Sequence, residues 1–311
     1  MNLEVQDMVS CGEPIDIGEC ASLKARVISE IGWQNNKILL GDIQIAGGME
    51  TSQYQVDWEE GNAAGYSALL ESVGLDGKTH RILLDTGWDL EYIDRRFQEE
   101  GIDKLLLDNQ IDFLFLSHEH MDHLWGLPAT IKYQPDITIR VTSTLGPDGR
   151  ALIRNSGHTG RLEVASPWKV YPLFPGCASV TFNMPIILRT IGEQALFFNI
   201  KDRGLVVVTG CCHMGIVKLL KFAAENIMGG DRVYGIFGGL HISPFDRWEA
   251  AQEEAVEYLA KLGIAKVGCH HCTGKLAVDK MRERGIAVVG GTGRFGSKSD
   301  AYLGNGDEIV F

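Results

Sequence analysis

Residues 116–123 read Leu-Ser-His-Glu-His-Met-Asp-His and hold four potential metal ligands within six positions, directly behind a short apolar run. In extended backbone successive side chains point to opposite sides, so His118 and His120 project to the same side while Glu119 turns away. If the chain then turns into a helix, Asp122 and His123 are carried around the bend, where they can reach a second ion or orient the first pair. The stretch therefore predicts half of a dinuclear metal site.

The composition is that of a globular protein with a large core. The chain has 311 residues, of which 45% are hydrophobic and 23% charged, so disorder is not indicated. No break in composition marks a domain boundary. We expect one domain over residues 1–311, with an N-terminal strand and loop extension at 1–63 and a long loop at 145–175.

The charge balance narrows the range of partners. Acidic residues number 41 against 29 basic ones, which gives a net charge of -12 and disfavours sequence-independent binding to nucleic acid or to an anionic membrane. The sequence has no long apolar span, and its start lacks a basic segment followed by an apolar one. We expect a cytoplasmic protein whose seven cysteines are reduced thiols.

Strand and helix signals alternate along the chain and predict an α/β fold. Asp76-Gly77 separates two apolar runs and predicts a hairpin turn. Asp89 can cap a helix that ends at Gly101, and Ser243 with Pro244 can open a helix to about residue 262. A further helix is expected at 275–284, and strands are expected at 111–116, 137–141, 205–209, 233–237, 265–268 and 286–289.

Ligand-type residues recur at one structural position. Each follows the C-terminal end of a predicted strand, where ligands gather in open α/β sheets. These residues are Asp85, His118, Cys211 with His213, His241 and His271.

Together these motifs resemble the metallo-β-lactamase superfamily. The resemblance covers about residues 64–290 and rests on Asp85-Thr86-Gly87, the H-x-H-x-D-H run and the late His271. It implies a four-layer αβ/βα sandwich, in which two mixed β-sheets are flanked by helices and the metal site lies at one edge of the sheets. Further motifs resemble the subgroup named for 7,8-dihydropterin-6-methyl-4-(β-D-ribofuranosyl)-aminobenzene 5'-phosphate synthase. They are 65–67, 84–87, 209–217, 238–241 and 271–274.

The resemblance assigns most of the metal ligands. It implies that His118, His120 and a third residue bind one ion, and that Asp122, His123 and His271 bind the other. Two divalent ions are expected, with zinc favoured and iron or manganese as alternatives.

The third residue is where this sequence departs from hydrolytic relatives. Residues 191–194, before a predicted strand, contain no histidine, and Cys211 occupies the usual position of a bridging Asp. His213 is our choice for the missing imidazole. His158, in a Gly-His-Thr-x-Gly stretch, is the alternative, and Cys211 itself is either a thiolate near the metals or a small buried hydrophobe.

Accessory roles follow the same pattern. An Asp at the position of Asp85 typically orients the histidine cluster by accepting a hydrogen bond. Asp122 is also a candidate catalytic residue. His241 either hydrogen-bonds within the core or contacts substrate, and Thr273 is placed with it in the substrate-binding set.

These residues predict a metal-dependent hydrolase that uses a metal-bound hydroxide. A phosphoester or phosphodiester small molecule is the leading substrate, because hard oxygen anions suit an open dinuclear site. Two alternatives are a synthase that joins a pterin and an arylamine phosphate, as the subgroup name implies, and a metal-containing binding or sensor module. The sequence leaves the oligomeric state open.

Overall fold

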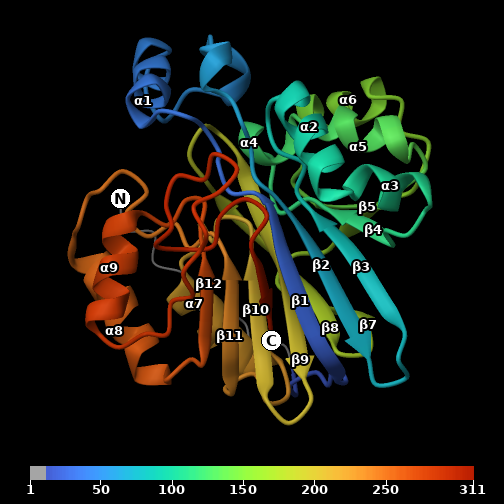
Figure 1. The fold of residues 1–311 in the computed structure, drawn as a ribbon, viewed down its shortest axis with the longest axis vertical. Coiled ribbons are helices and arrows are strands. Elements are labelled where there is room, and N and C mark those ends of the chain that lie inside the picture. The colour runs from blue at the N-terminus through green and yellow to red at the C-terminus, as the bar shows by residue number, and fades with distance from the viewer. Residues whose placement is uncertain (1–11) are drawn as a thin grey trace.

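The computed structural model describes residues 12–311 (Figure 1). Residues 1–11, which belong to the expected N-terminal extension and include Cys11, lie outside the described residues. One sheet consists of β1 (Cys20–Ser29), β2 (Ser67–Gly74), β3 (Thr79–Leu84), β4 (Phe113–Phe115), β5 (Ile139–Thr142) and β6 (Leu162–Ala165), with β13 (Glu308–Val310) paired to β1. The other consists of β7 (Val170–Phe174), β8 (Cys177–Pro185), β9 (Ile191–Ile200), β10 (Gly204–Thr209), β11 (Val233–Gly238) and β12 (Lys266–Cys269). Among the described residues, the strand pairing between β1 and β9 that joins the two sheets involves one pair, Cys20 with Ile200.

Helices cover the outer faces of both sheets. The first sheet carries α2 (Leu90–Glu100), α3 (Ile102–Leu107), α4 (Met121–Leu124), α5 (Leu127–Tyr133) and α6 (Pro147–Asn155). The second carries α7 (Ile216–Asn226), α8 (Ala250–Leu262) and α9 (Lys275–Glu283). In Figure 1 these two groups flank the strands from opposite sides, and α1 (Asn36–Ile45) sits above one end of the strands.

Side-chain alternation along the strands builds the layers. In β9, Leu196 and Phe198 pack between the sheets, whereas the intervening Phe197 packs toward the helices of the second sheet. In β3, Leu84 packs between the sheets and Leu83 packs toward the helices of the first sheet. The layers follow one another as helices, sheet, sheet and helices, with apolar side chains packed between each pair of layers. This arrangement confirms the predicted four-layer sandwich. Within residues 12–311, no helix combines the length and apolar character needed to cross a membrane.

Local signals predicted many elements well. Asp89 accepts a hydrogen bond from the Tyr92 amide at the start of α2, and Gly101 ends this helix with φ 71°. The Asp76-Gly77 turn joins β2 and β3 as expected.

Other expectations were wrong. The helix expected from Ser243 begins at Ala250, because Glu249 and Gln252 form its capping box. The segment 145–175, expected as a long loop, contains α6, β6 and β7. Residues 286–289 were expected to form a strand but contribute one isolated β-bridge, between Val288 and Val267. β13, at the end of the chain, was not predicted.

Candidate metal centre

The H-x-H-x-D-H stretch leaves β4 and turns into α4 as the sequence predicted. His118 and His120 precede α4, whereas Asp122 and His123 lie in its first turn, and all four side chains are buried. The second sheet brings its ligand-type residues to the same place, because β10, β11 and β12 are parallel and their carboxyl ends are adjacent.

One group of imidazoles gathers around His118. Its Nε2 lies 3.0 Å from Nδ1 of His120 and 3.3 Å from Nε2 of His213. The structure therefore brings the residue chosen as the third imidazole next to the first two.

A second group gathers around His123. Its Nε2 lies 3.1 Å from Nε2 of His271. The carboxylate of Asp122 lies 3.5 Å from His271 Nε2 and 3.8 Å from His123 Nε2. The three residues assigned to a second ion by resemblance thus meet at one point.

Cys211 lies between the two groups. Its Sγ is 3.2 Å from Nε2 of His123. Ligand atoms of His118, Cys211 and His213 lie within 4.8 Å of one another, and so do those of His123, Cys211 and His271. One thiol is therefore shared by two sets of donors, at the position where hydrolytic relatives have an Asp.

Asp85 fixes the orientation of the histidines. Its Oδ2 accepts hydrogen bonds from the Ser117 hydroxyl (2.6 Å) and from Nδ1 of His123 (2.6 Å). Because the Ser117 proton is used on Asp85, the serine oxygen accepts from Nδ1 of His118 at 2.9 Å. The Nε2 atoms of His118 and His123 are then left free to face the other potential metal-ligand atoms.

Backbone carbonyls orient two other imidazoles. Nε2 of His120 donates to the Ile187 carbonyl at 3.0 Å, and Nδ1 of His271 donates to the Glu30 carbonyl at 3.1 Å. The free nitrogen of His120 is consequently Nδ1, which faces the free Nε2 of His118. Two lone pairs 3.0 Å apart without a shared proton repel each other, and a cation bound between them removes the repulsion. The donor set therefore fits a metal ion.

The pKa shifts agree with neutral imidazoles on the His118 side. Burial and the neighbouring imidazoles hold the pKa of His118 and His213 well below the usual value, and burial lowers the pKa of His120 to about 3. On the other side, burial lowers the pKa of His123, but the carboxylates of Asp122 and Asp85 outweigh it and raise the value to about 9. A proton and a metal ion thus compete for His123.

Comparison with known proteins agrees with the fold and the motifs. Residues 64–152 match the family model of the metallo-β-lactamase superfamily. The chain is 27% identical over 256 residues to the 7,8-dihydropterin-6-methyl-4-(β-D-ribofuranosyl)-aminobenzene-5'-phosphate synthase of Methanocaldococcus jannaschii. The aligned region covers 70% of this chain and 84% of that protein. These matches confirm the predicted resemblance to the metallo-β-lactamase superfamily. The resemblance to the synthase subgroup is also confirmed.

Solved structures share the fold over most of the chain. A metal-dependent hydrolase of the β-lactamase superfamily superposes with a TM-score of 0.60 at 18% identity, covering 92% of this chain and 98% of that one. Zinc-bound PqqB from Methylobacterium extorquens superposes with a TM-score of 0.52 at 13% identity, covering 93% and 99%. These likenesses support the metallo-β-lactamase sandwich.

Two side chains of residues 271–274 (His-Cys-Thr-Gly) lie where we did not expect them. Cys272 lies at the centre, where its Sγ donates to the Cys211 carbonyl at 3.5 Å and accepts from the His241 amide at 3.3 Å. Thr273 is buried, and its hydroxyl accepts a hydrogen bond from the Leu240 amide at 3.0 Å. Thr273 holds two loops together and does not line the pocket, so we remove it from the substrate-binding set.

Glu193 is a supporting residue that the sequence reasoning missed. Its carboxylate accepts hydrogen bonds from three consecutive amides, those of Cys211 (3.2 Å), Cys212 (2.7 Å) and His213 (2.6 Å). Burial raises its pKa to about 7, although these amides act in the opposite direction. The segment 191–194, which contains no histidine and forms the start of β9, thus supplies the carboxylate that shapes the ligand loop after β10.

His158 lies outside this cluster. Its Nε2 donates to the Ile137 carbonyl at 2.7 Å, near the start of β5. That bond ties the loop after α6 to the sheet, which gives His158 a structural role without a metal. The structure therefore favours His213 over His158.

The segment between β1 and β2 covers the centre. Trp33 stacks on Phe245 with ring centroids 6.1 Å apart and meets the edge of His271 at 6.2 Å. Leu39 and Ile43 of α1 line the same pocket, together with Met49, His120, Met121, Asp122, Ile187, Leu188, Cys211, His213, His241 and Cys272. The pocket thus has polar donors on one side and an apolar wall on the other.

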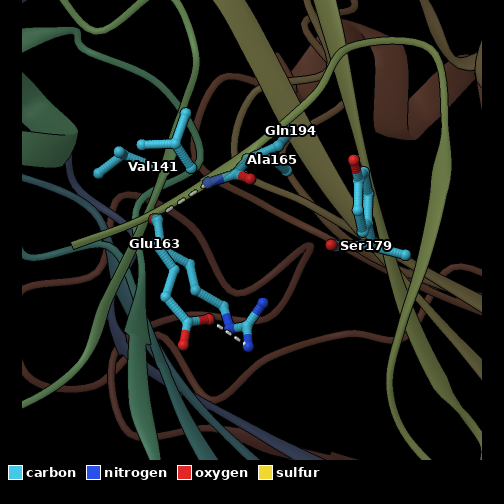
Figure 2. A pocket seen from close by; sticks show the side chains of 8 residues that line it. Val141, Glu163, Ala165, Ser179 and Gln194 are labelled. Carbon is cyan, nitrogen blue, oxygen red and sulfur yellow. Dashed lines mark hydrogen bonds and ion pairs between the residues drawn. The ribbon is translucent and has the colours of Figure 1, made fainter. Parts of the chain in front are cut away.

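Figure 2 shows a different cavity, between the edge strands β5 and β6 and the strands β8 and β9. Arg140 and Glu163 form an ion pair there at 2.5 Å. Gln194 also lines it and donates to the Leu116 carbonyl at 2.6 Å. Its lining offers neither histidine nor cysteine, so this cavity lacks the side chains that make the candidate metal centre.

Proposed function

We propose that this chain is a metal-dependent hydrolase of a small phosphorylated molecule. The observation that supports it best is the position of Cys211, which is common to two groups of imidazoles and lines the pocket beside them. Divalent ions held by such donors polarise a phosphoryl oxygen and make water a better nucleophile at neutral pH.

The chain's own residues supply the remaining steps. Asp122 lines the pocket and is buried, and burial raises the pKa of its carboxyl group. A carboxylate in that position can hold a proton taken from the attacking water. His241 lines the same pocket, where it would contact the leaving group or the substrate.

The pocket wall suggests which molecule enters. Trp33, Leu39, Ile43 and Phe245 give it an apolar side suited to a flat or apolar group. The ammonium group of the exposed Lys298 lies 5.1 Å from the centre of the Trp33 ring and would supply a counter-charge to a phosphate bound beside that ring. We infer a substrate that joins a phosphate to a flat apolar group.

The donor set bears on the metal. Imidazole and thiolate ligands suit zinc and iron better than magnesium or calcium, whose preferred ligands are oxygen atoms. We propose two divalent ions, with zinc favoured.

A second candidate is a synthase that joins a pterin and an arylamine phosphate. The name of the Methanocaldococcus jannaschii relative favours it, and the aromatic pocket wall would accept a pterin ring. In this reaction the same metal ions would stabilise a leaving diphosphate.

Metal analysis followed by substrate assays tests the proposal. The full chain is purified without added metal, its metal content is measured, and it is assayed on phosphomonoesters, cyclic nucleotides and aryl phosphodiesters. We expect hydrolysis that disappears with a chelator and returns with zinc. The Trp33→Ala variant should raise KM for aromatic esters and leave kcat within about twofold.

The assays also separate the two candidates. Product formed from a pterin diphosphate and an arylamine phosphate, without net hydrolysis of phosphoesters, would favour the synthase. Hydrolysis that is unchanged after complete metal removal would contradict the proposal.

A further inference from the structure

Cys211, His241 and Cys272 form a third donor group, beside the two that hold the proposed metal pair. We propose that these three side chains make a further metal position, rich in sulfur, that takes a soft or borderline cation such as zinc or cadmium. This proposal goes beyond the hydrolase function, because hydrolysis needs only the two groups built on His118 and His123.

The three ligand atoms converge from three separate strands. Cys211 follows β10, His241 follows β11 and Cys272 follows β12, and their ligand atoms lie within 4.8 Å of one another. Such a spacing suits three ligands of a tetrahedral ion, which leaves a fourth position for a pocket molecule. Because all three residues line the pocket, an ion can reach them.

His241 has a ring nitrogen without a partner. Its Nδ1 is buried and accepts or donates no hydrogen bond among residues 12–311. Its backbone has φ 48°, in the left-handed region that costs non-glycine residues free energy, so the surrounding structure must stabilise this backbone conformation. A buried polar atom without a partner costs free energy, which a bound cation would recover.

Cys272 is also placed as a ligand. Its thiol is buried but belongs to none of the hydrophobic core clusters of the described chain, whereas Cys212 and Cys269 both pack into the core against α7–α9. Gly239 makes room for the sulfur, because a Cβ atom there would lie 2.6 Å from Cys272 Sγ. A cysteine that only filled space would be expected among apolar side chains, as Cys269 is.

The chemistry of this group differs from that of its neighbours. Two thiols and one imidazole favour zinc, cadmium or copper(I), whereas Asp122 on the other side of Cys211 favours harder ions. The centre would therefore discriminate between metals at its different positions.

Cadmium is a direct probe of this group. Metal-free full-length protein is titrated anaerobically with Cd²⁺ alone, in the presence of a phosphine reductant. Bound cadmium is counted by equilibrium dialysis, and thiolate coordination is followed by its ultraviolet charge-transfer absorption. Wild type, Cys272→Ala, His241→Ala and the matched control Cys269→Ala are compared, with thermal unfolding to verify folding.

We expect wild type and Cys269→Ala to bind three ions per chain, and Cys272→Ala and His241→Ala to bind two. The Cys272→Ala variant should also lose part of the charge-transfer absorption. Equal stoichiometry in wild type and in both centre variants would overturn the proposal, and so would two ions in wild type. If Cys272→Ala fails to fold, the number of cadmium ions bound by His241→Ala tests the proposal, because His241 is partly exposed and its replacement should disturb folding less.

This experiment is independent of the proposed hydrolase. Two ions per chain with metal-dependent hydrolysis would remove only the third position. Three ions without turnover on any phosphoester would remove only the hydrolase.

Discussion

At the scale of single residues, Asp85 decides which nitrogen of His123 is free to bind a metal. Asparagine tolerates the left-handed backbone of this position (φ 57°), but it has one acceptor oxygen where Asp85 uses two, Oδ2 for His123 and the Ser117 hydroxyl and Oδ1 for the Ser117 amide at 2.7 Å. We expect Asp85→Asn to weaken metal affinity by roughly ten- to a hundredfold, as other substitutions that remove a ligand's supporting partner do.

Competition with a coloured chelator measures this affinity. Asp89→Asn is the matched control, because Asp89 caps the start of α2 and does not contact the ligands. This variant should keep wild-type metal affinity. Equal affinity of Asp85→Asn and wild type would show that Asp85 does not orient the ligand.

Gly32 is a second residue whose size matters at the centre. A Cβ atom on Gly32 would lie 2.6 Å from Oδ2 of Asp122 and 2.8 Å from Cε1 of His271. We expect Gly32→Ala to displace these two ligands and to lower metal content below that of wild type. Gly41→Ala, in open space on α1, should have wild-type metal content when measured by elemental analysis. A full metal complement in Gly32→Ala would contradict this reading.

The side chains that meet at the candidate centre could be predicted from the sequence because their types and spacing are typical of metal sites. His118, His120 and His123 stand together in one motif, and His213 was found by asking which imidazole was missing. Gly32 and Glu193 could not be found this way. A glycine and a glutamate carry no metal signal by themselves, and their roles depend on contacts across the two sheets.

At the scale of elements, the loop after β10 depends on a carboxylate from β9. Glu193→Ala would leave the buried amides of Cys211, Cys212 and His213 without their acceptor. Each unsatisfied buried amide costs about 1–3 kcal/mol, so we expect the free energy of unfolding to fall by at least about 2 kcal/mol. Denaturant unfolding measures the change.

Glu163→Ala is the control for this loop. Glu163 pairs with Arg140 and Arg161 near the surface, where ion pairs contribute about 0–1 kcal/mol. A loss for Glu193→Ala no larger than that for Glu163→Ala would show that the carboxylate does not shape the ligand loop.

Elements with strong local signals were predictable, and those defined by distant contacts were not. The caps of α2 and the Asp76-Gly77 hairpin follow from neighbouring residues. The helix expected at Ser243 starts seven residues later, because Ser243 and Asp246 adopt positive φ in the loop that carries His241 to the pocket. β13 is only three residues long and forms by pairing with β1, nearly the whole chain away.

At the scale of the whole molecule, the centre joins the two sheets. The donors His118 to His123 belong to the first sheet, and Cys211, His213 and His271 belong to the second. An ion bound by both stabilises the folded chain over the unfolded one, by about 4 kcal/mol when free metal exceeds its dissociation constant a thousandfold. We therefore expect a chelator to lower the melting temperature and added zinc to restore it. An unchanged melting temperature after verified metal removal would mean that the sheets hold together without the ions.

The sandwich itself could be predicted because strand ends, motif order and hydrophobic pattern all agree with one known fold. The cover over the pocket could not. The region 1–63 was expected as a strand and loop, yet α1 forms within it and its aromatic neighbours pack over the histidines. Short helices of this kind take their stability from tertiary packing more than from local sequence.

Anomalous X-ray diffraction from zinc-loaded crystals tests the central claim most directly. We predict peaks between His118 and His213 and between His123 and His271, with the Cys211 sulfur within bonding distance of both. Zinc bound only at places away from these two groups, or ions at these positions with Cys211 turned away, would contradict a centre built around a shared thiolate.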